Sequence, residues 1–297
     1  VKRFIFCLFL TCFITAIIGI LQIPGGDRVS APFEGERGEP NTLGGYLLFI
    51  GSVAAGLLSK TKDQKVRKLL IFLIIVMIPP FLFTQSRASY LALVPVCLTL
   101  GLMAQRRIII LGLIIISFSL SPFFLPAPVK NRILYTFTQP EEAGQIAIGE
   151  IRLDTSTSAR LVSWREALKN WLKHPIIGYG VTGYSFVDAQ YPRVLTETGI
   201  LGFIAFIYLL FSIFRLAVNN LRTVTTPHFK GLCLGFMTGY TGLLVHALAA
   251  NTFIIVRIME PFWFFVGIVA VLPTLERQGV TQLQTDEVPR RKFAPVS

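Results

Sequence analysis

Long apolar runs alternate with short polar gaps along most of this chain. A run of about 17–25 mostly apolar residues is what an α-helix needs to cross roughly 30 Å of hydrocarbon. The pattern predicts an all-α, polytopic membrane protein with about eight transmembrane helices and one large external loop between the fifth and the sixth. The expected spans cover residues 4–23, 43–59, 69–85, 88–104, 108–125, 195–218, 231–250 and 252–273.

These spans divide the chain into four parts. Residues 1–125 are expected to carry helices one to five, 126–194 the large external loop, 195–273 helices six to eight, and 274–297 a cytoplasmic tail. The first span resembles a signal peptide, because Lys2 and Arg3 precede it. Its apolar stretch is too long for that, and no small-residue cleavage site follows, so we expect it to remain a helix.

Lysine and arginine residues are concentrated in every second polar segment between the apolar spans. The positive-inside rule assigns these gaps to the cytoplasm. The other side carries as many acidic as basic residues, so the whole formal net charge of +12 is assigned to the cytoplasmic side, with both termini inside. This charge reports topology and attraction to anionic lipids, and nucleic acid is not expected as a partner. The basic residues in question are Lys2, Arg3, Lys60, Lys62, Lys65, Arg67, Lys68, Arg106, Arg107, Arg215, Arg222, Lys230, Arg277, Arg290, Arg291 and Lys292.

Two external segments stand out by composition. The first, residues 24–42, is rich in glycine, proline and charge, and is expected to form a solvated turn that ends in polar capping residues at the start of the second span. The second contains a predicted amphipathic helix over 156–173, which would lie on the outer leaflet or over a cavity. One of Ser156, Thr157 and Ser158 would cap it, and the following His174 and Pro175 would end it.

Five stretches carry a family resemblance. They read GEPNTLGGYL at 38–47, TQSRASYLAL at 84–93, SARLVSWREALKNWLKHPIIGYG at 158–180, TETGILGF at 196–203 and HALAANTFIIVRIMEPFW at 246–263. Their order, their spacing around one large external loop and the topology together resemble the O-antigen polymerase and ligase family, the membrane glycosyltransferases of the Wzy and WaaL type.

The resemblance implies a substrate and a reaction. The substrate would be a glycan carried on undecaprenyl pyrophosphate, transferred to a sugar hydroxyl at the outer face of the bacterial cytoplasmic membrane while the lipid pyrophosphate leaves. It implies no cofactor, neither a nucleotide sugar nor a metal; membrane lipids, and a chain-length regulator or flippase, are the expected partners. Ligases of this family carry a histidine shortly before the segment that reads TETG here. This chain has Asp188, Ala189 and Gln190 there, which favours a polymerase over a ligase.

Three arginines are the expected ligands of the pyrophosphate. The planar guanidinium binds phosphate oxygens bidentately and stays protonated at any working pH. Arg87 lies at an external turn, Arg160 near the start of the amphipathic helix, and Arg257 in the first part of the eighth span. Other interpretations remain open: Arg87 as a helix-end residue that extends to headgroups, Arg160 as a solvated charge, and Arg257 as the partner of Glu260 one turn away.

The acceptor hydroxyl loses a proton during attack, so a general base is expected. Glu197 in TETG is the first candidate, followed by Asp188 and His246. Each also has a structural interpretation: Glu197 as an acid favoured by a helix N-terminus and His246 as a hydrogen-bonded helix residue. The supporting residues expected around the site are Asn41, Asn251 and Trp164.

A secondary transporter is the main alternative function, since some chains of the same broad family have been proposed to carry bicarbonate. Transporters place ionisable residues and broken helices near the membrane midplane, often in two related halves. The chain shows no internal repeat, and its charges gather at the external boundary. Pro79 and Pro80 in the third span are the best feature for a transporter. A non-catalytic assembly protein is the third possibility.

Overall fold

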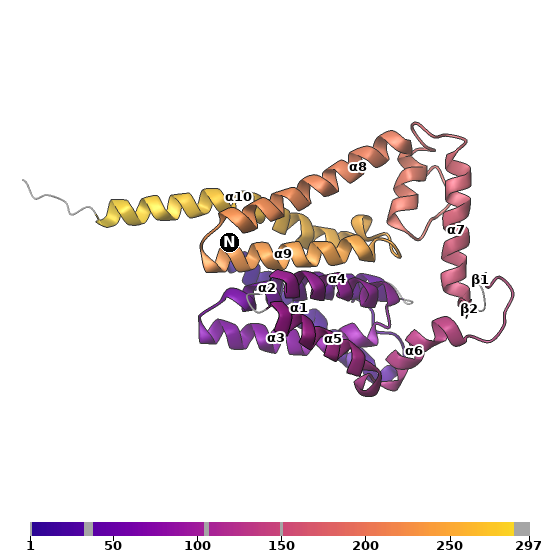
Figure 1. Ribbon diagram of the computed structural model, residues 1–297, viewed down its shortest axis with the longest axis horizontal. Coiled ribbons are helices and arrows are strands. Elements are labelled where there is room, and N and C mark those ends of the chain that lie inside the picture. Colours follow the sequence, from indigo (N-terminus) through magenta and orange to yellow (C-terminus); the bar gives the residue numbers. More distant parts are fainter. Residues whose placement is uncertain (1, 33–37, 104–106, 149–150, 288–297) are drawn as a thin grey trace, which may run out of the picture.

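The protein is almost entirely helical (Figure 1). The computed structural model describes residues 2–32, 38–103, 107–148 and 151–287. The elements are α1 (Lys2–Gln22), η1 (Ile23–Gly25), α2 (Pro40–Lys60), α3 (Gln64–Phe83), α4 (Arg87–Met103), α5 (Arg107–Phe124), α6 (Ala127–Thr138), β1 (Ala147–Ile148), β2 (Ile151–Arg152), α7 (Thr155–Trp171), α8 (Gln190–Thr223), α9 (Pro227–His246), η2 (Thr252–Ile254) and α10 (Val256–Glu287).

Several of these helices are long and apolar enough to cross a membrane. In the described part of the chain they are Lys2–Gly25, Pro40–Lys60, Gln64–Phe83, Gln190–Thr223 and Val256–Gln278, while α4 and α5 provide shorter apolar helices. The predicted class, a helical multi-pass membrane protein, is therefore confirmed, but the count of eight spans is not. The expected seventh span, α9, does not reach the same hydropathy, because glycines and polar residues that serve packing inside the bundle take the place of lipid-facing apolar ones.

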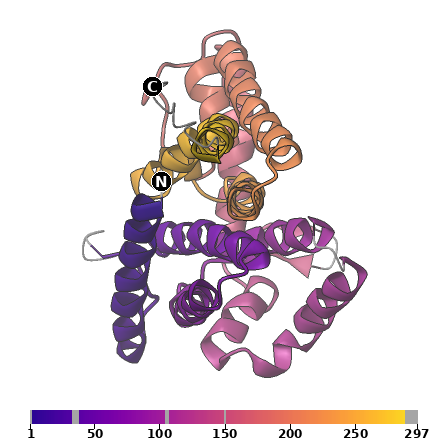
Figure 2. The same ribbon diagram turned by 90° about the vertical axis from the view of Figure 1, so that its left-hand side faces the viewer.

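Helices α2 and α9 form the centre of the bundle. A Cβ atom added to Gly56 of α2 would lie 2.2 Å from the backbone nitrogen of Gly235 of α9, so the two backbones touch. Small residues permit this approach because they have no large side chain to hold the two helix backbones apart. Aromatic rings fill the space beside the contact, with Phe49 and Phe236 at 6.1 Å between ring centroids. In Figure 2, α9 and α10 are seen nearly end-on.

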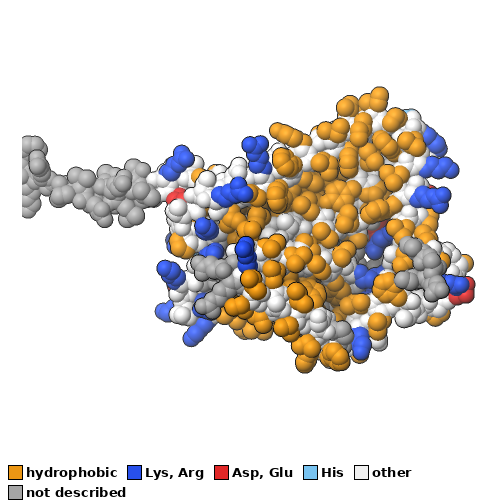
Figure 3. Space-filling model, viewed as in Figure 1, with side chains coloured by type: hydrophobic (Ala, Val, Ile, Leu, Met, Phe, Trp, Pro, Cys, Tyr) orange, Lys and Arg blue, Asp and Glu red, His pale blue; other side chains and the backbone are white. Residues whose placement is uncertain are grey.

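The molecule has two chemically different ends. The connections at 61–63 and 224–226 lie at one end, which we call the basic-loop end, and α6, α7 and the short β1–β2 pair lie at the other, the α7 end (Figure 1). Figure 3 shows lysine and arginine side chains along the basic-loop end, a broad apolar surface in the middle and further basic side chains at the α7 end. This is the arrangement that the positive-inside pattern predicts; the orientation in a membrane stays a prediction.

Helix α7 crosses the ends of the long helices at the position of the predicted amphipathic helix (Figure 1). Its cap differs from the prediction. Asp154, rather than a hydroxyl residue at 156–158, accepts a hydrogen bond from the Thr157 backbone nitrogen at 2.9 Å. A carboxylate suits this place because it also interacts favourably with the helix dipole. The polar side-chain cap expected at the start of the second span is also wrong, since no side chain caps the start of α2.

Two helix boundaries differ from the expected ones. Helix α8 begins at Gln190 and is interrupted at Gly199, where φ is 64°. Only glycine adopts this backbone conformation readily. Helix α10 continues to Glu287, so the expected tail from residue 274 begins as a continuation of the last helix; residues 288–297 lie outside the described part.

Candidate functional site

Four arginines from four elements approach one another at the α7 end. They are Arg28 in the loop after η1, Arg87 at the start of α4, Arg132 in α6 and Arg160 in α7, and we call them the arginine cluster. Arg28 lies within electrostatic range of the other three, and Arg132 lies within range of Arg87 and Arg160. Figure 3 shows basic side chains in a recess at this end of the molecule. Such a concentration of positive charge outside the bundle favours an anionic ligand.

Arg87 is held by a buried carboxylate. Its Nη1 forms an ion pair with Asp154 Oδ2 and donates to Thr136 Oγ1 at 2.8 Å. The Asp154 side chain is 1% exposed. Burial raises the pKa of Asp154, but the hydrogen bonds from Thr157 and Arg87 outweigh it and hold that pKa below its ordinary value. Arg87 therefore joins α4 to the first turn of α7 and adds its charge to the cluster.

Arg28 fastens the first external loop to the turn between α3 and α4. Its Nε donates to the Thr84 carbonyl at 3.0 Å and its Nη2 to the Gln85 carbonyl at 3.3 Å. Gln85 has a positive φ of 48°, which turns the chain sharply between the two helices. Burial, followed by the neighbouring charge of Arg132, lowers the pKa of Arg28. Sequence reasoning missed this residue because it lies in a loop that was expected to be a solvated turn.

Arg132 is the member of the cluster whose guanidinium has a hydrogen-bond donor without a partner in the described part of the chain. Its Nε is buried and has no hydrogen-bond partner among the described residues. Burial and the charges of Arg87 and Arg160 lower its pKa, against the opposing effect of Asp154. A partly buried guanidinium with unused donors beside like charges is costly unless an anion joins it. The sequence offered no motif for Arg132, since it lies between the stretches that resemble the family.

Arg160 points to a small recess that opens beside the cluster. Its Nη2 lies 3.3 Å from Asp188 Oδ2 and its Nε 3.4 Å from the same atom. The recess has a volume of about 260 Å³, just below the range of roughly 300–1,000 Å³ that pockets for larger ligands occupy. Its lining residues are Ser156, Ala159, Arg160, Ser163, Trp164, Phe186 and Asp188. Three residues singled out from the sequence, Arg160, Trp164 and Asp188, thus share one recess.

Glu197 lies in a different environment. Its Oε1 accepts a hydrogen bond from Arg193 Nε at 3.0 Å, and its side chain is 14% exposed. Its backbone belongs to the interruption of α8, where the carbonyls of Thr196 and Glu197 accept hydrogen bonds at 2.9 Å from the backbone nitrogens of Tyr179 and Gly180. The stretches HPIIGYG at 174–180 and TETG at 196–199 therefore form one interlocked unit.

His246, Asn251 and Asn41 support the loops around the cluster. The His246 side chain is fully buried, and its Nδ1 lies 2.8 Å from Thr252 Oγ1. Asn251 Nδ2 donates to the Val187 carbonyl at 2.9 Å, next to Asp188, while Asn41 Oδ1 accepts from Ser86 Oγ at 2.7 Å, next to Arg87. The asparagines thus fix the backbone beside two charged residues of the site.

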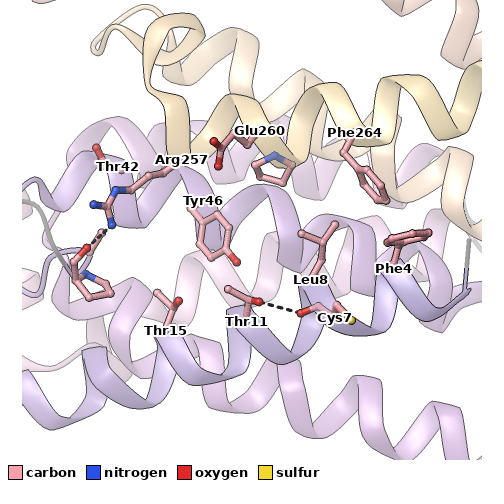
Figure 4. Close-up of a pocket in the computed structure, with 13 residues that line it drawn as sticks. Phe4, Cys7, Leu8, Thr11, Thr15, Thr42, Tyr46, Arg257, Glu260 and Phe264 are labelled. Atoms are coloured by element: carbon pink, nitrogen blue, oxygen red, sulfur yellow. Dashed lines mark hydrogen bonds between the residues drawn. The ribbon is translucent and has the colours of Figure 1, made fainter.

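Arg257 lines a separate pocket between α1, α2 and α10 (Figure 4). The pocket has a volume of about 400 Å³ and is mostly apolar, with Glu260, Tyr46 and Thr42 among its polar members. Arg257 Nη1 donates to the Pro32 carbonyl. The structure thus brings Arg87 and Arg160 together at the α7 end and places Arg257 in another pocket.

The protein is a helical bundle with an apolar middle, a basic end and an arginine-rich opposite end. This arrangement is typical of multi-pass membrane proteins. Residues 71–207 match the family described as O-Antigen ligase. This match confirms the resemblance read from the motifs and assigns this region to the O-antigen polymerase and ligase family, whose members are membrane glycosyltransferase and ligase enzymes. It includes Arg87, Arg132, Arg160, Asp188 and Glu197. No curated protein matches the chain.

Proposed function

We propose that the protein is a membrane glycosyltransferase that polymerises a glycan carried on undecaprenyl pyrophosphate, at the outer face of the bacterial cytoplasmic membrane. The observation that carries the proposal is the arginine cluster, which outnumbers its buried partner Asp154 and adjoins the recess of Asp188. A diphosphate supplies the negative charge that this arrangement lacks. The basic-loop end and both termini then face the cytoplasm, and membrane lipids, with a chain-length regulator or flippase, are the partners.

The arginines have different tasks in this proposal. Arg132, with its unused donors, grips the pyrophosphate directly, while Arg87 and Arg160 contribute charge and the donors that their carboxylate partners leave free. As the bond between the anomeric carbon and the phosphate oxygen breaks, negative charge grows on the leaving group. Preorganised cations in a partly dry site stabilise that charge by several kcal/mol.

Asp188 is the general base that the geometry favours. Its side chain is 43% exposed and lies in the recess, whereas Glu197 is largely covered and paired with Arg193, and His246 is fully buried. The acceptor hydroxyl gives its proton to the Asp188 carboxylate while its oxygen bonds to the anomeric carbon. The electron pair of the broken bond leaves with the lipid pyrophosphate.

A ligase is the second form of the same chemistry, and the family description names it. The polymerase is preferred because Asp188 occupies the segment where ligases of the family carry a histidine. A transporter would be favoured if Pro79 and Pro80 broke the third span. Helix α3 instead continues through both prolines to Phe83, so this feature does not support a transporter.

The test is the glycan phenotype of a strain that lacks this gene. A lost polymerase leaves surface polysaccharide with single repeat units, whereas a lost ligase lets long chains accumulate on the carrier lipid. Complementation with Arg132→Lys should fail, because lysine keeps the charge but not the fork. Complementation with Lys130→Ala, an exposed neighbour in α6, should succeed. Normal polysaccharide together with impaired solute uptake would contradict the proposal and support the transporter.

A further inference from the structure

We propose that the recess beside Arg160 is a subsite for one sugar of the acceptor glycan, with Trp164 and Phe186 as its apolar walls. The inference rests on the proposed function and adds the site where the acceptor binds. Of the two aromatic residues, the sequence indicated only Trp164, as a supporting residue of the site.

The size of the recess suits a single sugar. At about 260 Å³ it lies just below the range of roughly 300–1,000 Å³ that pockets for larger ligands occupy. A whole repeat unit would extend beyond it, toward the solvent or the arginine cluster. One sugar ring would fill it.

The chemistry of the lining matches a sugar better than a simple anion. A pyranose ring presents apolar C–H groups on its faces and hydroxyls around its rim. Trp164 and Phe186 offer aromatic surface for the first, and the Asp188 carboxylate, the Arg160 guanidinium and nearby serine hydroxyls offer acceptors and donors for the second. A free anion would be repelled by Asp188, which lies 3.3 Å from Arg160.

Phe186 presents an exposed aromatic ring at the recess. It is 73% exposed, and the Arg193 guanidinium lies 5.7 Å from its ring centroid. A cation above an aromatic ring orients it, so Phe186 is held at the recess instead of folding away. The exposed face of the ring can therefore lie against the apolar face of a bound sugar.

The position of the recess relates the sugar to the reaction. Arg160 belongs to the arginine cluster and also to the recess, and Asp188, the proposed base, is on its wall. A sugar bound there would place a hydroxyl beside the carboxylate while the donor pyrophosphate lies among the arginines. The subsite therefore selects the acceptor independently of the lipid carrier.

The experiment uses the full chain in lipid nanodiscs and two probes. One is the phosphate-free repeat oligosaccharide released from the surface polysaccharide of the source organism, and the other is farnesyl pyrophosphate. We expect Phe186→Ala and Trp164→Ala each to weaken oligosaccharide binding about tenfold, since each removes one stacking surface. Phe186→Ala should leave farnesyl pyrophosphate binding unchanged. Leu172→Ala, an exposed apolar residue just after α7 and outside the recess, is the matched control and should change neither.

Two results would overturn the subsite. One is oligosaccharide binding that is absent in the wild type, or equal in the wild type and both aromatic variants. The other is a Phe186→Ala variant that loses only affinity for the lipid surface, which would make Phe186 an interfacial anchor. If Trp164→Ala does not fold, Trp164→Phe, which keeps a ring, should retain binding, and exposed Phe186 still decides. Failure of farnesyl pyrophosphate binding with intact oligosaccharide binding would count against the proposed function and leave the subsite standing.

Discussion

Arg87 at the start of α4 forms an ion pair with Asp154, the buried residue that caps α7. The pair joins a helix of the bundle to the helix that crosses its end. A carboxylate that is 1% exposed requires such compensation, because a buried charge without a partner is strongly unfavourable. The pair therefore fixes α7, and with it Arg160 and Trp164, relative to the bundle.

Asp154→Asn should destabilise the protein. The change leaves the Arg87 charge partly buried without its counterion and weakens the α7 cap, at a cost of about 1–3 kcal/mol. Thermal unfolding in detergent should show a clearly lower Tm. The control is Glu141→Gln, which breaks the exposed pair with Arg152 and should cost at most about 1 kcal/mol. Equal effects of the two substitutions would contradict a structural role for the buried pair.

The contribution of Asp154 to stability should disappear only in acid. Its folded-state pKa lies below the ordinary value of 3.8, so its contribution is fully present above that value and is lost as the pH falls through the folded-state pKa. We expect the Tm difference between the wild type and Asp154→Asn to be constant from about pH 5 to pH 8 and to shrink below about pH 4. If the Tm difference changed between pH 6 and pH 8, the pH dependence would come from a titratable group other than Asp154.

Arg132→Ala should weaken binding of farnesyl pyrophosphate more than the loss of any exposed lysine nearby. Charge-assisted hydrogen bonds to an anion contribute about 1.5–3 kcal/mol, which corresponds to roughly ten- to a hundredfold in Kd. Isothermal titration in nanodiscs measures it, with Lys130→Ala as the control in the same helix. Equal affinities of the two variants would remove Arg132 from the site.

The fold could be predicted from the sequence only as far as apolar length determines it. Helices α1, α2, α3, α8 and α10 follow from this rule because each is long and apolar enough to cross a membrane. Helix α9 was also expected, over 231–250, but it does not reach the hydropathy of these helices, because glycines that lie in close contact with α2 take the place of more apolar residues. That contact depends on tertiary packing, which a single sequence does not display.

The site was predictable where a residue lies in or near a stretch that resembles the family. Arg87, Arg160 and Asp188 lie within or beside such stretches, and the structure brings them to one end of the molecule. Arg28 and Arg132 could not be found this way, because their place in the cluster depends on contacts with Thr84 and with the charges of distant helices. The pairing of Arg160 with Asp188 likewise depends on how the segment before α8 folds back against α7.

Asp188→Asn should reduce turnover far more than Glu197→Gln. Removal of a general base costs about 10²–10⁴-fold in rate, whereas Glu197 is paired with Arg193 and does not line the recess. The measurement is the initial rate of chain extension with a lipid-pyrophosphate donor at saturating acceptor. A large loss in Glu197→Gln with normal Tm, together with an active Asp188→Asn, would restore Glu197 as the base.

Gly178→Ala should disrupt the interlocked unit, and Gly180→Ala is its matched control. Both glycines have positive φ, 70° and 89°, so each substitution strains the backbone by about 1–2 kcal/mol. They differ in space: a Cβ at Gly178 would lie 2.6 Å from the Thr196 carbonyl oxygen, whereas one at Gly180 meets nothing within 4 Å. Gly178→Ala must therefore also push the HPIIGYG loop away from the break in α8. We expect it to lower the Tm more than Gly180→Ala and to increase hydrogen exchange at Tyr179 and Gly180, whose amides donate to that break. Equal Tm losses and unchanged exchange would mean that the loop is not held by the close approach at Gly178.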